Sequence, residues 1–259
     1  MKKLFITDLD GTALGGDYEQ YARFPDAFSE FLDSLVAQGC SWGINTTWDV
    51  SGQWDLVNIS SVKSKPEYLM AEFGRRMAKS TDNGPQFIQP YTDKMAVKLE
   101  EFCKHKFSVL IRDICGNFNA ERIFYYGHLF QFIVASSDDL EEFKKFVEKF
   151  VVDDKFVCNF KQRSFSVRPA FLNKYAPVKE VQKQIKLSPD QVIVAGDEPA
   201  DIDMMNSEIA THYICPANAN EQVKAHVHKY NGEVAELAYG AGVIQAFNRL
   251  SKRYNWGIN

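Results

Sequence analysis

A short apolar segment that ends in two aspartates is the feature that most constrains the fold of this chain. Residues 3–12 read Lys-Leu-Phe-Ile-Thr-Asp-Leu-Asp-Gly-Thr, so an apolar run stops at Asp8 and Asp10. Open α/β sheets bind ligands outside the carboxyl ends of their strands. A buried strand that delivers two carboxylates to that edge therefore predicts an α/β fold with a ligand site at the end of its first strand.

Alternating short strands and helices are predicted at both ends of the chain. Residues 26–38 carry apolar side chains at helical spacing and end at a glycine, and residues 41–45 and 67–73 read as short buried strands. After residue 174 we expect strands at 191–195 and 213–215 and helices at 177–185, 201–206 and 242–252. A strand, a helix and a second strand form one βαβ unit, so these patterns predict a Rossmann-like parallel-sheet core built from both ends of the chain.

The middle of the chain has a different pattern. Residues 81–85, Thr-Asp-Asn-Gly-Pro, form a cluster of turn formers that we interpret as a linker. Beyond it, two amphipathic helices alternate with two hairpins, with helices at 92–107 and 138–150 and strands at 122–126, 129–135, 155–160 and 164–167. The sequence thus predicts a core of residues 1–82 and 170–259, with a small α+β domain of residues 83–169 inserted into it.

Composition limits the possible partners. The 259 residues carry a formal net charge of −4 and contain no Lys/Arg-rich run, which argues against nucleic acid as the main partner. No apolar stretch is long enough to cross a membrane, and no signal peptide is recognisable. The five cysteines are scattered and never form a CxxC pair, so we expect a cytoplasmic protein without a zinc site. The sequence does not indicate an oligomeric state.

Asp8 and Asp10 have a chemical interpretation. Residues two apart on a strand point to the same side, so both carboxylates would reach one site. Two such carboxylates repel each other unless a cation lies between them or one is protonated, and a hard divalent ion such as Mg²⁺ resolves the conflict. Asp8 could then attack a phosphorus atom while Asp10 exchanges a proton with the leaving and attacking oxygens. The alternative is an ordinary turn after an edge strand.

A second acidic cluster follows the strand at 191–195. Asp201 is explained equally well as a helix cap, but Asp197 comes directly after the strand, where a cap does not account for it. Two strands of one parallel sheet that each end in aspartate would converge on a shared cation. Thr46 follows a third strand and could hold a phosphate oxygen, and Lys174 could supply a fixed positive charge beside the metal.

Together these motifs resemble the haloacid dehalogenase superfamily of phosphohydrolases. Asp8-Leu9-Asp10-Gly11-Thr12 matches its first motif, Thr46 the second, Lys174 the third and Gly196-Asp197 with Asp201 the fourth. The stretch between Thr46 and Lys174 is long enough to hold the inserted domain. That placement is similar to the C2-capped, type IIB branch, which includes Cof-like sugar phosphatases, sucrose-phosphate phosphatases and phosphomannomutases.

The resemblance implies a role for each motif residue. Asp8 would be the nucleophile and Asp10 the general acid/base, while Leu9, Thr46, Thr47 and Lys174 would bind the phosphoryl group. Mg²⁺ would be held by Asp8, the backbone carbonyl of Asp10 and Asp197, with Asp201 as a ligand or as support. The expected enzyme is a Mg²⁺-dependent phosphatase of a small phosphorylated metabolite, for example a sugar phosphate. The alternatives are a sugar phosphomutase and a catalytically idle binding protein on the same scaffold.

Three motifs depart from the family pattern. Family members often have Thr-Gly-Arg, Lys-Gly and Asn-Asp where this chain has Thr46-Thr47-Trp48, Lys174-Tyr175 and Ala200-Asp201. Trp48 and Tyr175 mark either an altered leaving-group pocket or a repacked loop. In the inserted domain Arg122, His128 and Arg163 are candidate substrate contacts, and His226-x-His228 is predicted to lie on a solvated helix face.

Overall fold

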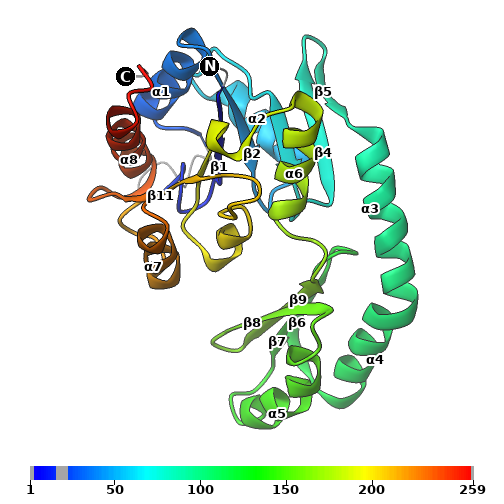
Figure 1. Cartoon of the computed structure of the whole chain (residues 1–259). Helices are drawn as coiled ribbons and strands as arrows, with labels where there is room; N and C mark the ends of the chain where they lie inside the picture. The colour runs from blue at the N-terminus through cyan, green and yellow to red at the C-terminus, as the bar shows by residue number, and fades with distance from the viewer. Residues whose placement is uncertain (1–2, 16–22, 258–259) are drawn as a thin grey trace. The chain divides into compact units, whose positions relative to one another are not determined.

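In the computed structural model, which describes residues 3–15 and 23–257, the chain divides into two compact units (Figure 1). The core unit comprises Met1–Tyr91 and Asn173–Asn259, and the inserted unit comprises Thr92–Leu172. The β4–β5 hairpin, Arg76–Thr81 and Gly84–Phe87, therefore belongs to the core unit. The predicted linker at residues 81–85 is wrong in this respect, because its turn formers make the tip of that hairpin.

One eight-stranded sheet forms the centre of the core unit. Its strand order is β12-β11-β10-β1-β2-β3-β4-β5, parallel from β12 to β3 and antiparallel from β3 to β5. The six parallel strands are β1 (Lys3–Thr7), β2 (Cys40–Asn45), β3 (Tyr68–Ala71), β10 (Val192–Ala195), β11 (His212–Cys215) and β12 (Glu233–Val234). The chain runs from β1 to β2 on one side and returns to β10 on the other, so β1 lies at the point where the strand order reverses.

Helices cover both faces of this sheet. A large apolar cluster joins α1, α2 and α8 to alternate strand residues such as Phe5, Ile44 and Ile193. On the other side α6 contacts β3, and α7 contacts β11. The helices are α1 (Asp26–Ala37), α2 (Val50–Ile59), α6 (Tyr175–Ile185), α7 (Glu221–Lys229) and α8 (Tyr239–Arg253), with 3₁₀ turns η3 (Pro189–Gln191) and η4 (Pro199–Asp203). The parallel-sheet α/β class is confirmed.

The inserted unit is a four-stranded antiparallel sheet with helices, in the strand order β6-β7-β9-β8. Its elements are α3 (Gln89–Phe102, which begins in the core unit), the π-helical turn η2 (Cys103–Phe107), α4 (Ser108–Asn117), β6 (Ala120–Tyr125), β7 (Phe130–Val134), α5 (Leu140–Val151), β8 (Phe156–Lys161) and β9 (Ser164–Pro169). Phe130, Phe132, Val134, Phe165 and Val167 are buried against these helices, so the unit has its own core.

Two further differences concern the core unit. The helix expected at 201–206 is instead the short 3₁₀ turn η4, which begins at Pro199. The sequence reasoning did not include α2, whose start is fixed by the Asp49 side chain accepting a hydrogen bond from the Gly52 N–H at 2.7 Å. All five cysteines are free thiols. Within the described residues, no helix combines the length and apolar character needed to span a membrane.

Candidate active site

Asp8 lies directly beyond β1, between the carboxyl ends of β2 and β10. Its backbone N–H donates to the Ala195 carbonyl at 3.0 Å, which continues the parallel ladder one residue past the strand. The aspartate is therefore held by the sheet itself, and its side chain is buried. This is the position at which a sheet of this topology binds ligands.

Lys174 and Asp201 join Asp8 in a buried ionic cluster. The Lys174 Nζ lies 2.8 Å from Oδ1 of Asp8 and 2.5 Å from Oδ1 of Asp201, and the lysine is 2% exposed. The two carboxylates raise the pKa of Lys174, outweighing the desolvation that opposes them, so the ammonium stays charged. Burial also raises the pKa of Asp201, which Lys174 opposes only in part. Lys174, which the sequence predicted as a cation at the site, thus contacts both Asp8 and Asp201.

Asp197 completes the cluster from the end of β10. Its Oδ1 accepts a hydrogen bond from the Thr12 hydroxyl at 2.6 Å. Gly11, at φ +78°, brings the backbone so close that a Cβ there would lie 2.2 Å from Oδ2 of Asp197. Burial, followed by the neighbouring negative charges of Asp201 and Asp8, raises the pKa of Asp197 to about 7 against the pull of the Thr12 hydrogen bond.

The donor set at this point suits a hard divalent cation. Asp8, Asp197 and Asp201 each present a carboxylate oxygen within 4.8 Å of the others. Mg²⁺ prefers oxygen ligands, and it would compensate the negative charges of Asp201 and Asp8, which after burial raise the pKa of Asp197. Asp201 already uses Oδ1 on Lys174 and Oδ2 on the N–H groups of Asp197 and Glu198, both at 2.9 Å. Its geometry therefore suits support better than direct ligation.

Asp10 lies in the tight turn after Asp8, with its side chain exposed. The turn is cross-linked by hydrogen bonds from the N–H groups of Thr12 and Leu14 to the Leu9 carbonyl, at 3.1 and 2.8 Å. The indole N–H of Trp48 donates to Oδ2 of Asp10 at 2.6 Å. This contact links Asp10 of the first motif to Trp48, the residue that follows Thr46-Thr47 where family members often have arginine.

Thr46 and Thr47 lie beyond β2 in different environments. Thr46 is buried and its N–H donates to the Met70 carbonyl at 3.1 Å, whereas Thr47 is exposed. The preceding Asn45 was not anticipated as a site residue, but its Nδ2 donates to the Lys174 carbonyl at 2.8 Å. Asn45 therefore holds the loop that carries Lys174 in place. The sequence did not indicate this role, because an asparagine at the end of a strand is not a distinctive pattern.

The loop after β11 also supports the site. The side-chain amide of Asn218 donates to the Gly11 carbonyl at 2.7 Å, and its oxygen accepts from the Tyr239 N–H at 2.8 Å. The N–H of Asn220 donates to the Asp197 carbonyl at 2.8 Å. These two asparagines fix the backbone of the first and fourth motifs, and no sequence pattern distinguished them.

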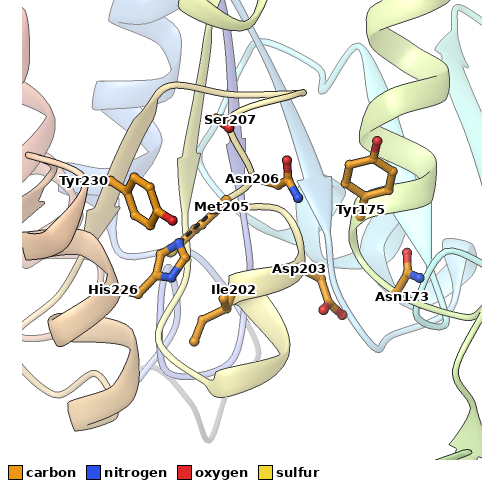
Figure 2. A pocket seen from close by; sticks show the side chains of 9 residues that line it. All are labelled: Asn173, Tyr175, Ile202, Asp203, Met205, Asn206, Ser207, His226 and Tyr230. Carbon is orange, nitrogen blue, oxygen red and sulfur yellow. Dashed lines mark hydrogen bonds between the residues drawn. The ribbon is translucent and has the colours of Figure 1, made fainter. Parts of the chain in front are cut away.

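A separate polar cavity of about 380 Å³ adjoins η4 and α7 (Figure 2). Tyr175 and Asp203 are among its lining residues, but Asp8, Lys174, Asp197 and Asp201 are not. His226 also lines it, with its Nε2 paired to the Met205 carbonyl at 2.8 Å, as the dashed line in Figure 2 shows. His228 is exposed, and among the described residues no group of three or more possible metal ligands includes either histidine.

The three candidates in the inserted unit are not equivalent. Arg163 is tied to its own sheet, because it donates to the Val134 and Ala135 carbonyls and pairs with Glu121 at 2.7 Å. His128 is buried in the β6–β7 turn. Arg122 is exposed on β6, opposite Ile133 of β7 on the sheet face that the helices leave open. Of the three, only Arg122 is exposed.

Comparison with known proteins agrees with this geometry. The sequence model for haloacid dehalogenase-like hydrolases matches residues 88–246, a stretch that includes Lys174, Asp197 and Asp201. Phosphoglycolate phosphatase of Nitrosopumilus maritimus (strain SCM1) is 22% identical over 253 residues, 96% of each chain.

Solved structures show the same fold. The sucrose-phosphatase of Synechocystis sp. PCC6803, solved with sucrose and phosphate, aligns with a TM-score of 0.66 at 16% identity, covering 96% of this chain and 98% of that one. A haloacid dehalogenase-like hydrolase of Bacillus subtilis aligns with a TM-score of 0.60 at 16% identity, covering 96% and 91%.

Because the matching family model spans more than half of the chain, the chain belongs to the haloacid dehalogenase-like hydrolases. The predicted family and the predicted enzyme class, a hydrolase of the phosphatase type, are confirmed.

Proposed function

We propose that this chain is a Mg²⁺-dependent phosphatase that hydrolyses a small phosphorylated metabolite through an aspartyl-phosphate at Asp8. The observation that carries the proposal is the buried contact of Lys174 with both Asp8 and Asp201, with the Asp197 carboxylate beside them. Burying four ionisable groups together is costly for folding, so such a cluster is characteristic of functional sites.

Each residue has a defined task in this proposal. Asp8 attacks the phosphorus atom, and Asp10 gives a proton to the departing oxygen and later takes one from the attacking water. Lys174 places a positive charge beside the phosphoryl oxygens, and the Thr46–Thr47 segment follows β2, the strand paired with β1. Mg²⁺, held by Asp8, Asp197 and the Asp10 carbonyl with support from Asp201, would neutralise charge on the transferring group.

The substrate proposed is a phosphate monoester of a small organic molecule. One relative is named as a phosphatase of phosphoglycolate, and one structural neighbour holds sucrose and phosphate. We further propose that the inserted unit, Thr92–Leu172, acts as a cap that selects the leaving group, with Arg122 as a candidate contact. We also propose that the protein works in the cytoplasm without a nucleic acid or membrane partner.

A phosphate-release panel with the Asp8→Asn variant tests the proposal. The purified chain is incubated with Mg²⁺ and 2-phosphoglycolate, sucrose 6-phosphate, hexose phosphates and 4-nitrophenyl phosphate. We expect Mg²⁺-dependent release by the wild type, and loss of release in Asp8→Asn with an unchanged circular dichroism spectrum. Turnover by Asp8→Asn would contradict the mechanism. Isomerised monophosphate from a hexose bisphosphate would indicate a mutase, and silence across the whole panel would indicate a binding protein.

A further inference from the structure

Residues 46–48, the segment that follows β2, are held by the side chain of Gln53. This glutamine lies in the first turn of α2 and is fully buried, at 0% exposure. Its Nε2 donates to the Trp48 carbonyl at 3.1 Å and to the Met70 carbonyl at 3.2 Å. The amide therefore connects α2 to the end of this segment and to the neighbouring strand β3.

Each of the two carbonyls also accepts a backbone N–H. The Met70 carbonyl takes the N–H of Thr46 at 3.1 Å, which joins the start of the segment to β3. The Trp48 carbonyl takes the N–H of Glu72 at 3.2 Å, which joins the end of the segment to the turn after β3. Gln53 therefore bonds to the carbonyl that anchors each end of residues 46–48.

The Gln53 amide acts toward the rest of the chain as a double donor. Its two N–H groups meet two carbonyl acceptors, which also fixes the orientation of the amide. Among the described residues its buried Oε1 has no hydrogen-bond partner. An apolar side chain of similar size would fill this place without an unpaired oxygen, so stability alone does not explain a glutamine here.

We propose that Gln53 is a positioning residue that holds residues 46–48 where they bind the phosphoryl group. The inference rests on the proposed function, in which Thr46 and Thr47 contact the phosphoryl oxygens. Both threonines lie in the segment whose two ends Gln53 anchors. The position of such a segment matters for rate, because a misplacement of about 1 Å can cost roughly 10²-fold.

The consequence is a loss that does not depend on the leaving group. Every phosphate monoester presents the same phosphoryl group to residues 46–48, and inorganic phosphate presents similar oxygens. A displaced segment should therefore weaken binding of all these molecules by a similar factor. Gln53→Met should preserve the fold, because the two carbonyls that Gln53 contacts each keep a backbone N–H as donor.

The test compares Gln53→Met with the wild type in the presence of Mg²⁺. We expect the inhibition constant of inorganic phosphate to rise about fivefold or more, as the loss of two hydrogen bonds to the segment implies. The value of kcat/KM should fall by a similar factor on 4-nitrophenyl phosphate and on an alkyl phosphate that the wild type hydrolyses. Gln182→Met is the matched control and should change neither quantity, because Gln182 is a buried glutamine of α6 that donates to the Ile209 carbonyl at 3.3 Å.

Gln53→Asn keeps the amide but shortens the side chain by a methylene, so it answers the question if the methionine variant folds poorly. A change of less than about twofold in the inhibition constant of phosphate, or a loss that differs between the two esters, would overturn the role of Gln53. Either result would leave the phosphatase proposal intact. Absence of Mg²⁺-dependent turnover by the wild type, or turnover by Asp8→Asn, would instead remove the proposed function on which the inference depends.

Discussion

Removing the charge of Lys174 should destabilise the folded chain far more than removing a surface lysine. Lys174 is 2% exposed and contacts Asp8 and Asp201 at 2.8 and 2.5 Å, so Lys174→Met leaves two buried carboxylates without their partner. Breaking a buried ion pair by removing one partner typically costs about 3–5 kcal/mol, because the remaining charge stays desolvated. We expect a loss in that range at neutral pH.

The measurement is urea unfolding of the wild type and the variant without added metal, supported by thermal melting. The loss corresponds to a fall in Tm of roughly 6–20 °C, at about 2–4 °C per kcal/mol for a chain of this size. Lys179→Met is the control, because Lys179 is exposed and lies 3.9 Å from Glu208. That exposed pair should be worth less than about 1 kcal/mol.

A second substitution separates charge from packing. Asp201→Asn added to Lys174→Met removes one of the orphaned charges, so the double variant should recover part of the lost unfolding free energy. The loss in Lys174→Met should also shrink as pH falls, because burial raises the pKa of Asp201 and protonation removes its unpaired charge. The reasoning is refuted if Lys174→Met costs no more than Lys179→Met, or if the double variant is less stable than Lys174→Met.

Two further outcomes concern the metal and the turn. Burial raises the pKa of Asp197 from 3.8 to about 7, so the folded state binds more protons than the unfolded state between these values. In EDTA, the unfolding free energy of the wild type relative to Asp197→Asn should therefore fall by up to about 4 kcal/mol as pH rises from about 4 to 7. Mg²⁺ should restore the unfolding free energy of the wild type most at pH 8. If the difference in unfolding free energy between the wild type and Asp197→Asn did not change with pH, the raised pKa of Asp197 would be contradicted. Gly11→Ala should abolish Mg²⁺-dependent turnover, because the added Cβ would lie 2.2 Å from the Asp197 side chain. Gly39→Ala is the control and should keep turnover, because Gly39 has a similar φ of +79° but nothing within 4 Å of an added Cβ. Equal kcat values for the two variants would count against a metal site at Asp197.

The parallel core could be predicted from sequence because its strands are short apolar runs with polar residues at their ends. The β4–β5 hairpin could not, since the turn formers at residues 81–85 signal a linker and a hairpin tip equally well. The α2 helix was missed because its interior, including Gly52, has weak helix propensity and depends on the Asp49 cap and on packing. The 3₁₀ turn η4 replaced an expected helix because Asp201 folds back onto the N–H groups of Asp197 and Glu198.

Some residues of the site could likewise be predicted from the sequence and others could not. Asp8 and Asp197 could be placed because Asp8 directly follows β1 and only Gly196 separates Asp197 from β10, and these two strands proved to be neighbours. Lys174 was singled out because a site of carboxylates and phosphate needs a fixed cation and because it matches the third motif, since a lone lysine before a helix carries no local signal. The bracing by Asn45 and Asn218 and the contact of Trp48 with Asp10 depend on side-chain directions that appear only when distant loops meet.

The charges of the cluster imply an order of binding. Three carboxylates face one ammonium, which leaves two uncompensated negative charges when all are ionised. A phosphate monoester is itself an anion, so it would enter such a site against electrostatic repulsion. A divalent cation supplies the two missing positive charges, and Lys174 alone cannot, because it is shared between Asp8 and Asp201. Under the proposed function, we therefore expect the metal to bind before the substrate.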